Sequence, residues 1–322
     1  DLWFVAGNRL HERGWRRDSP SDLSQLFGKV GFRRGGDDVA LSIAAADNDL
    51  TGNGLQEEQA LARDWRSVYT TPDQTRNRAL LANLSATRRI DERNSLSGNV
   101  YVRRIRTGTY NGDLNDESLT ESVLQPNAAE RQALTDAGYS GFPASGATPA
   151  NTPFPRWRCI ANVLLNSEPN EKCNAVVQRT ATTQTQWGAA LQWSGERELA
   201  GLRHRALAGV AYETSRVAFT QSTQFGTLNP DRSVATVDGP GAYADGTQDS
   251  ENATDSRVDL SSRTRTYSLY ASDTISLSDA THLTVSGRWN RQHVRSADAI
   301  TPGGGPGSLD GDYVYTRLNP AD

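Results

Sequence analysis

The residues that could react or bind a ligand are few and widely separated in this sequence. Cys159 and Cys173 are the only cysteines, and they lie in a stretch rich in Pro and Asn that has no histidine or third cysteine at metal-ligand spacing. Two thiols placed in this way favour a local disulfide, formed in an oxidising compartment, over two free thiols. We therefore expect a cross-link here, and neither a metal site nor a cofactor.

Aromatic and charged side chains are the remaining candidates for ligand contact. Tyr101, Arg103 and Arg288 occupy the polar positions of segments in which apolar and polar residues alternate. They could contact an anionic or sugar ligand along a polar passage, or they could belong to a hydrated wall in which Arg and acidic residues pair across strands. Trp157, close to Cys159, could offer a stacking surface, with packing inside a loop as its alternative.

Several functional classes find no support in the residue pattern. The four histidines show no ligand spacing; they are His11, His204, His282 and His293. The glycine run at 303–305 lacks the strand, helix and lysine of a phosphate-binding loop, and no nucleophile motif surrounds any serine. The net charge of −4 and the scattered arginines are unlike a nucleic-acid-binding protein. We expect neither an enzyme nor a nucleic-acid partner.

Strands must position these side chains, because apolar and polar residues alternate through most of the chain. The clearest repeats run over residues 267–277 and 283–290, and a third places Trp187, Leu191 and Trp193 on one face. Asp273 alone falls among the apolar positions of its strand. Short turns at 34–37 and 91–94 separate neighbouring strands. The pattern predicts ten strands, and we expect the first and the last to be incomplete.

The composition allows a membrane sheet but excludes a helical membrane protein. Hydrophobic residues make up 36% of the chain and charged residues 22%. The longest apolar stretches, such as 79–82 and 160–165, are far shorter than the roughly 18 residues that a spanning helix requires. Strands of a membrane barrel need only about 9–11 alternating residues each, which keeps the average hydropathy low.

The connections between the expected strands are alternately short and long. Long polar connections follow the third, fifth and seventh strands, and the longest covers about residues 111–183 while another covers about 220–263. Transmembrane barrels have short periplasmic turns and long extracellular loops, with aromatic girdles near the strand ends. We therefore predict an all-β, antiparallel transmembrane β-barrel fragment. A secreted β-sandwich that binds carbohydrate or protein alternates in the same way and is an alternative.

Particular segments resemble one family of outer-membrane proteins. Residues 14–21 followed by 26–29 resemble the first barrel hairpin of TonB-dependent receptors, and residues 46–54 look like the next extracellular rim. Residues 267–277, 284–290 and 315–320 look like the repeated strand phrases of that family. The resemblance implies that residues 1–322 form about the first ten strands of a 22-stranded barrel, which a plug domain and a short energy-coupling box precede in the complete protein.

The resemblance also implies a function and partners. Such a receptor lies in the outer membrane of a Gram-negative bacterium, in contact with its lipid, and takes up a scarce ligand without catalytic residues. The TonB complex would act through the N-terminal part of the complete protein. The ligand would be a small molecule or an oligosaccharide, of the siderophore, haem, cobalamin or oligosaccharide class. A passive porin-like channel would use the same barrel without a plug and is the alternative.

Overall fold

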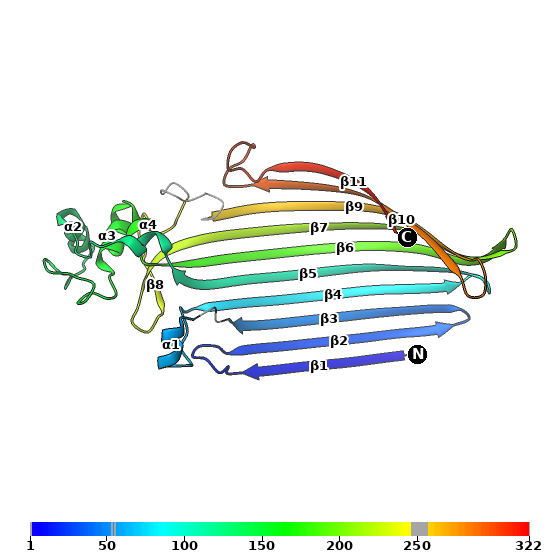
Figure 1. Ribbon diagram of the computed structural model, residues 1–322, viewed down its shortest axis with the longest axis horizontal. Coiled ribbons are helices and arrows are strands. Elements are labelled where there is room, and N and C mark those ends of the chain that lie inside the picture. The colour runs from blue at the N-terminus through cyan, green and yellow to red at the C-terminus, as the bar shows by residue number, and fades with distance from the viewer. Residues whose placement is uncertain (1, 53, 55, 246–256, 322) are drawn as a thin grey trace.

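The computed structural model of the chain is one antiparallel sheet with a helical end piece (Figure 1). It describes residues 2–52, 54, 56–245 and 257–321, so Asn53 and part of the connection expected over 220–263 lie outside the described residues. Within them, the strand order is β1-β2-β3-β4-β5-β6-β7-β9-β10-β11, and β8 pairs with the end of β7. This order confirms the predicted all-β antiparallel fold; the short strand β8 was not predicted.

Most strands are longer than a single membrane crossing requires. β6 has 25 residues and β7 has 27, against about 9–11 for a crossing. The bounds are β1 Leu2–Glu12, β2 Ser21–Arg34, β3 Asp37–Thr51, β4 Asp73–Arg89, β5 Asn94–Leu114, β6 Ala175–Leu199, β7 Leu202–Leu228, β8 Val234–Thr236, β9 Arg257–Ser276, β10 His282–Asp298 and β11 Gly311–Ala321.

The alternation of side chains gives the sheet two faces of opposite polarity. Residues that face each other on antiparallel strands lie on the same side of a sheet. The register therefore places Val100 with Leu84, and Tyr101 with Asn83. We call the side that carries Val100 the apolar face and the side that carries Tyr101 the polar face. Val100 is 55% exposed and Leu269 53%, so large apolar side chains are not covered by other parts of the described chain on this face.

The short turns lie at one end of the sheet and the long connections at the other (Figure 1). Gly35 and Gly36, between β2 and β3, have φ of 59° and 98°, and Ala200 and Gly201, between β6 and β7, have φ of 51° and 78°. Two positive φ values are what a tight two-residue hairpin needs to match the twist of its strands. The turn chemistry thus fixes the end at which neighbouring strands are joined closely.

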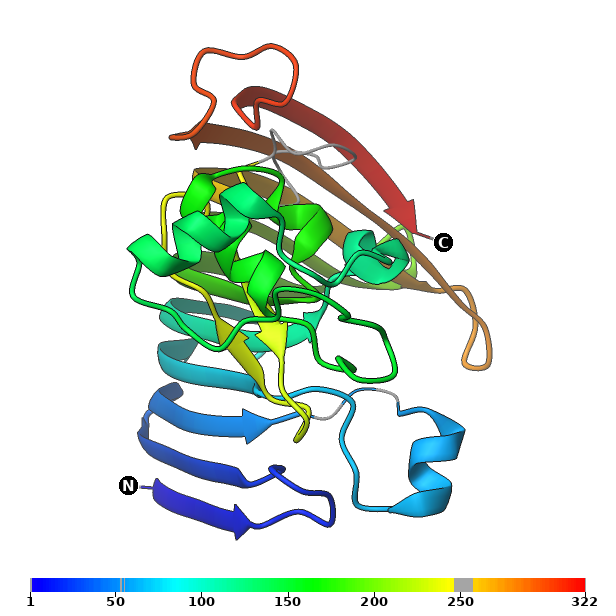
Figure 2. The ribbon, with the colours of Figure 1, turned by 90° about the vertical axis from the view of Figure 1, so that its left-hand side faces the viewer.

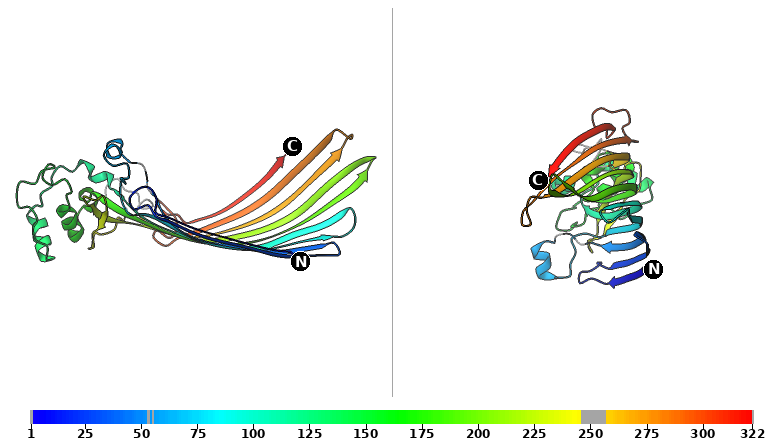
Figure 3. Two further views of the ribbon diagram at one scale, coloured as in Figure 1. Left: turned by 90° about the horizontal axis from the view of Figure 1, so that it is seen from below. Right: turned by 90° about the vertical axis from the view of Figure 1, so that its right-hand side faces the viewer.

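The sheet is open and curved. Its strands bend along their length and twist relative to one another (Figure 3). β1 and β11 are the two edges, and the described residues include no pairing between them. This shape is that of a barrel segment rather than of a closed barrel. None of the described helices has the length and apolar character needed to cross a membrane.

The longest connection folds into a small helical unit beyond the ends of β5, β6 and β7 (Figure 2). We call residues 115–174 the cap; its helices are α2 Ala128–Asp136, α3 Trp157–Leu165 and α4 Pro169–Lys172. A further helix, α1 Glu58–Arg63, lies between β3 and β4. The connection expected over about 111–183 is therefore shorter than predicted, because β5 extends to Leu114 and β6 begins at Ala175. Thr- and Gln-rich segments there pair through the backbone although they lack apolar alternation.

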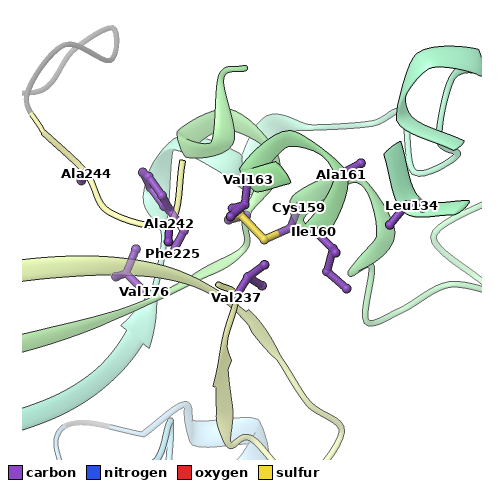
Figure 4. Packing of buried hydrophobic residues seen from close by; sticks show 11 residues of the cluster. Leu134, Cys159, Ile160, Ala161, Val163, Val176, Phe225, Val237, Ala242 and Ala244 are labelled. Atoms are coloured by element: carbon purple, nitrogen blue, oxygen red, sulfur yellow. A yellow bond between two sulfur atoms is a disulfide. The ribbon is translucent and has the colours of Figure 1, made fainter. Parts of the chain in front are cut away.

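The cap has a hydrophobic core of its own (Figure 4). Leu134, Cys159 and Val163 are fully buried in it, and Phe225, at the end of β7, is also 0% exposed within the same cluster. Residues after β8, including Val237 and the two alanines at 242 and 244, complete the cluster. The cap therefore packs onto the ends of the two longest strands as a fixed unit.

Candidate functional site

A hydrogen-bonded network crosses the polar face from β5 to β7. The hydroxyl of Tyr101 donates to Oε2 of Glu213 at 2.6 Å and accepts from Nε2 of Gln186 at 3.1 Å. The guanidinium of Arg103 donates to Oε1 of the same Gln186. Gln186 is 8% exposed, so its amide is held by both neighbours. The network ends in one anionic and one cationic side chain that do not pair with each other.

Gly188 allows Tyr101 to span two strands. Gly188 of β6 is directly opposite Tyr101, and a Cβ at this position would lie 2.7 Å from Cε1 of the tyrosine ring. The ring therefore lies across β6 and its hydroxyl reaches Glu213 on β7. An aromatic ring that covers a glycine on a neighbouring strand also replaces the packing that the glycine lacks.

Arg288 belongs to a second group on the polar face. Its guanidinium donates to Oδ1 of Asn290 at 2.9 Å and to Oγ of Ser268 at 3.0 Å, and lies 5.6 Å from the ring centroid of Tyr270. Tyr270 in turn covers Gly209, where a Cβ would lie 2.3 Å from the ring. The structure places Arg288 on the same face as Tyr101 and Arg103 but not in contact with them.

Trp157 lies in the cap, away from the network of the polar face. Its ring makes edge contacts with Tyr139 at 6.2 Å and with Phe142 at 5.9 Å, and the guanidinium of Arg156 lies 4.4 Å from its centroid. These three partners use its ring for packing within the cap. The structure therefore separates Trp157 from Tyr101, Arg103 and Arg288.

Cys159 and Cys173 are joined by a disulfide in the cap (Figure 4). Cys159 lies in α3, and Cys173 follows α4 two residues before β6 begins at Ala175. Both side chains are fully buried. The bond therefore ties the helical part of the cap to the start of a long strand.

Buried charges also organise the cap. Glu130 is 2% exposed; it completes a capping box with Asn127 at the start of α2 and accepts from Nε of Arg158 at 3.2 Å and from Nδ2 of Asn162 at 2.8 Å. A carboxylate removed from water needs such charged and polar partners. Glu130 thereby connects α2 to α3.

A second carboxylate, Glu121, contacts two cations. Oε2 of Glu121 lies 2.7 Å from Nζ of Lys172 and 2.9 Å from a guanidinium nitrogen of Arg158. Burial alone would raise the pKa of Glu121, but the hydrogen bonds from Lys172 and from the Val123 N–H, with the nearby positive charges, hold that pKa below its usual range. Glu121 is therefore ionised in the folded cap, where it pairs with both Lys172 and Arg158.

The sequence left Asp273 unexplained, and the register supplies its partner. Oδ2 of Asp273 lies 2.6 Å from Nδ1 of His204, on the same face of the neighbouring strand β7. The carboxylate among apolar positions is therefore paired across the strands near the short-turn end. Glu213 and Gln186 were also missed, because only the register shows that they meet Tyr101.

Solved structures of transporters and receptors for ferric ligands have the same arrangement. The chain matches the unliganded ferric citrate transporter FecA over 99% of its length, with a TM-score of 0.59 and 12% identity. It matches the ferric-catecholate import receptor Fiu from K12 E. coli with a TM-score of 0.54 and 12% identity, and the siderophore receptor PiuA from Acinetobacter baumannii with 0.55 and 10%. No protein-family model and no curated protein matches the sequence.

The likeness establishes the fold. The chain covers 35% of FecA, 42% of Fiu and 41% of PiuA, so it spans well under half of those proteins. The sheet is therefore a partial β-barrel of the kind found in TonB-dependent siderophore receptors. The expected resemblance and fold class are confirmed at this level.

Proposed function

We propose that the complete protein is an outer-membrane receptor that imports a scarce ligand with energy supplied by the TonB complex. The observation that carries the proposal is the polar face, whose hydrogen-bonded network of Tyr101, Arg103, Gln186 and Glu213 lies on a sheet with the fold of a ferric-ligand receptor barrel. In this proposal the polar face lines the lumen and the apolar face contacts lipid. The proposal assigns a catalytic role to none of the described residues.

The chemistry of the polar face suits the passage of a polar ligand. Arg103 and Arg288 offer guanidinium groups, and Glu213 offers a carboxylate. Paired hydroxyl groups lie on the same face closer to the cap, as in Thr109 and Thr180 at 2.7 Å. Each of these groups has a partner within the wall. A ligand can exchange hydrogen bonds with such a wall without being held tightly at any one position. The proposed ligands are of the siderophore, haem, cobalamin or oligosaccharide class.

Uptake by whole cells tests the proposal. A strain that lacks this gene is complemented with the complete protein, and the accumulation of radiolabelled ferric siderophores, haem, cobalamin and oligosaccharides is measured with and without a working TonB complex. We expect accumulation of one ligand class that requires both the protein and TonB. Accumulation that persists unchanged without TonB would identify a passive channel, and accumulation of none of the ligands would contradict the receptor.

A further inference from the structure

The apolar face has an ordered aromatic border on the side of the long connections. Trp187 of β6, Tyr212 of β7 and Tyr267 of β9 lie side by side there, with ring centroids 5.2 Å and 4.9 Å apart. Trp289 of β10 continues the border, directly opposite Leu269 of β9. Trp and Tyr at such a level mark the boundary between hydrocarbon and headgroups. Side chains just beyond this border face lipid headgroups.

Arginines occupy the positions beyond the border. One row of the sheet crosses from β5 to β10 on the apolar face through residues that are opposite each other in register: Arg104, Thr185, Arg216, Arg263 and Arg295. We call the four arginines in it the arginine row. Arg265 and Arg291 lie on the same face within the aromatic border, Arg265 in the row of Trp187 and Arg291 directly opposite Tyr267. No other level of the described sheet gathers as many cations.

Most of the charge of the arginine row has no partner in the sheet. Like charges that lie directly opposite on neighbouring strands repel. On β4, Arg76 at the same end of the apolar face is neutralised by Asp49 at 2.8 Å. Within the described part of the chain, by contrast, no carboxylate forms an ion pair with Arg216, Arg263 or Arg295, and Nε of Arg263 is buried without a hydrogen-bond partner. Asp312 of β11 continues the row opposite Arg295, but its carboxylate pairs with His293 at 2.6 Å. Within the described strands, Arg216 and Arg263 therefore have no carboxylate beside them in the row.

Two hollows on this face differ in polarity and together make an amphipathic surface. The first is lined by three arginines together with small polar and apolar residues: Arg216, Arg263, Arg295, Thr183, Thr185, Ser261, Ala218 and Ala297. The second lies on the membrane side of the first and is apolar, with Val100, Leu191, Tyr212, Tyr267 and Leu269 in its lining and Arg291 at its edge. Donors for an anion thus lie beyond a surface that suits hydrocarbon chains, with Thr214 and Arg265 between the two hollows.

We propose that the arginine row and the apolar hollow bind a lipid whose headgroup carries phosphates. The phosphates would lie on Arg216, Arg263 and Arg295, and the acyl chains against Tyr212 and Tyr267. The guanidinium fork matches phosphate oxygens with two hydrogen bonds, and uncompensated positive charge selects an anionic over a zwitterionic headgroup. The inference rests on the proposed placement of the protein in the outer membrane, with the long connections outside.

A triple variant of the complete protein tests the site. Arg216→Gln, Arg263→Gln and Arg295→Gln together remove the charge, and Arg34→Gln, Arg88→Gln and Arg197→Gln remove three arginines from the same face at the short-turn end as the matched control. Each protein in neutral detergent is titrated with bis-phosphorylated lipid A and with phosphatidylcholine, and native mass spectrometry counts the bound lipid. We expect the triple variant to bind lipid A about tenfold or more weakly than the wild type and the control.

A second measurement needs no variant and guards against misfolding. The wild-type protein is titrated with lipid A from which both phosphates have been removed, and we expect the same loss of affinity. Equal binding of the two lipids, or equal binding by the triple variant and the control, would overturn the inference. Complete displacement of lipid A by inorganic phosphate alone would also overturn it, by identifying a site for free anions.

Ligand uptake, measured in parallel, separates this inference from the proposed function. A protein that transports its ligand but does not discriminate between the two forms of lipid A contradicts the lipid site alone. A protein that retains lipid A but imports none of the ligands contradicts the receptor and leaves the lipid site supported. If the arginine row instead binds an acidic protein partner, the affinity of the protein for lipid A would not depend on the lipid phosphates.

Discussion

Two glycines of the polar face determine how its tyrosines lie. Gly188 and Gly209 each stand opposite a tyrosine on a neighbouring strand, and both would place a Cβ inside van der Waals contact of its ring. The rings can therefore lie flat across a strand instead of standing up into the lumen. The polar wall is thinner at these points than its content of aromatic residues would suggest.

Gly188→Ala tests this arrangement at a single residue. The new methyl group would meet the Tyr101 ring at 2.7 Å and displace it, so the hydrogen bond to Glu213 would be lost. We expect a destabilisation of about 1–3 kcal/mol, typical of overpacking, in denaturant unfolding of the complete protein. Gly28→Ala is the matched control, because a Cβ there meets nothing within 4 Å. Equal stability of the two variants would contradict the role of Gly188.

Sequence reasoning found some residues of the candidate site and not others. Tyr101 and Arg103 were predictable as polar positions because a period of two assigns each residue to a face. Gln186 and Glu213 were not, because a contact between β5 and β7 depends on the register of two intervening strand pairs. The same holds for Asp273, whose partner His204 lies on another strand.

At the scale of elements, the cap depends on its covalent and ionic links. The disulfide closes a loop of 14 residues, for which the chain-entropy argument gives a stabilisation of about 3 kcal/mol. We expect Cys159→Ser with Cys173→Ser to increase hydrogen exchange in α2 and α3 while exchange in β2 and β3 stays unchanged. Faster exchange throughout the sheet would show instead that the cap and the barrel unfold as one unit.

The cap should also lose stability in acid. The lowered pKa of Glu121 means that its contribution is fully present above the ordinary value of 4.5 and is lost as the pH falls through the lower folded value. Hydrogen exchange in α3, corrected for its intrinsic pH dependence, should therefore rise below about pH 4.5. Glu121→Gln should remove this part of the pH dependence, and an unchanged profile in that variant would assign the effect to another carboxylate.

The sequence predicted the strands of the sheet better than the cap. Alternation is strong where one face is apolar, so the ten strands of the continuous path were found. It is weak over residues 111–114 and 175–183, where apolar and polar residues do not alternate, and these strand ends were assigned to the loop of about 111–183. The Asn127 and Glu130 spacing of α2 is a capping-box signal that sequence alone could have shown.

At the scale of the whole molecule, the open sheet leaves unsatisfied surfaces. β1 and β11 are edges, and the apolar face exposes side chains such as Trp3, 79% exposed, and Leu318, 66% exposed. Exposed edges and broad apolar patches promote association. We expect residues 1–322 expressed alone to aggregate in buffer and to require detergent. A monodisperse monomer without detergent, observed by analytical ultracentrifugation, would contradict a membrane-facing apolar surface.

The length of β6 and β7 determines how far the cap stands from the membrane. A strand of 27 residues extends for roughly 90 Å, whereas the hydrocarbon layer is only about 30 Å thick. In the proposed orientation, even a tilted strand would hold the cap tens of ångströms above the bilayer. An antibody raised against intact cells would then meet the disulfide-bonded helices of the cap first, and would recognise their folded shape rather than a flexible peptide.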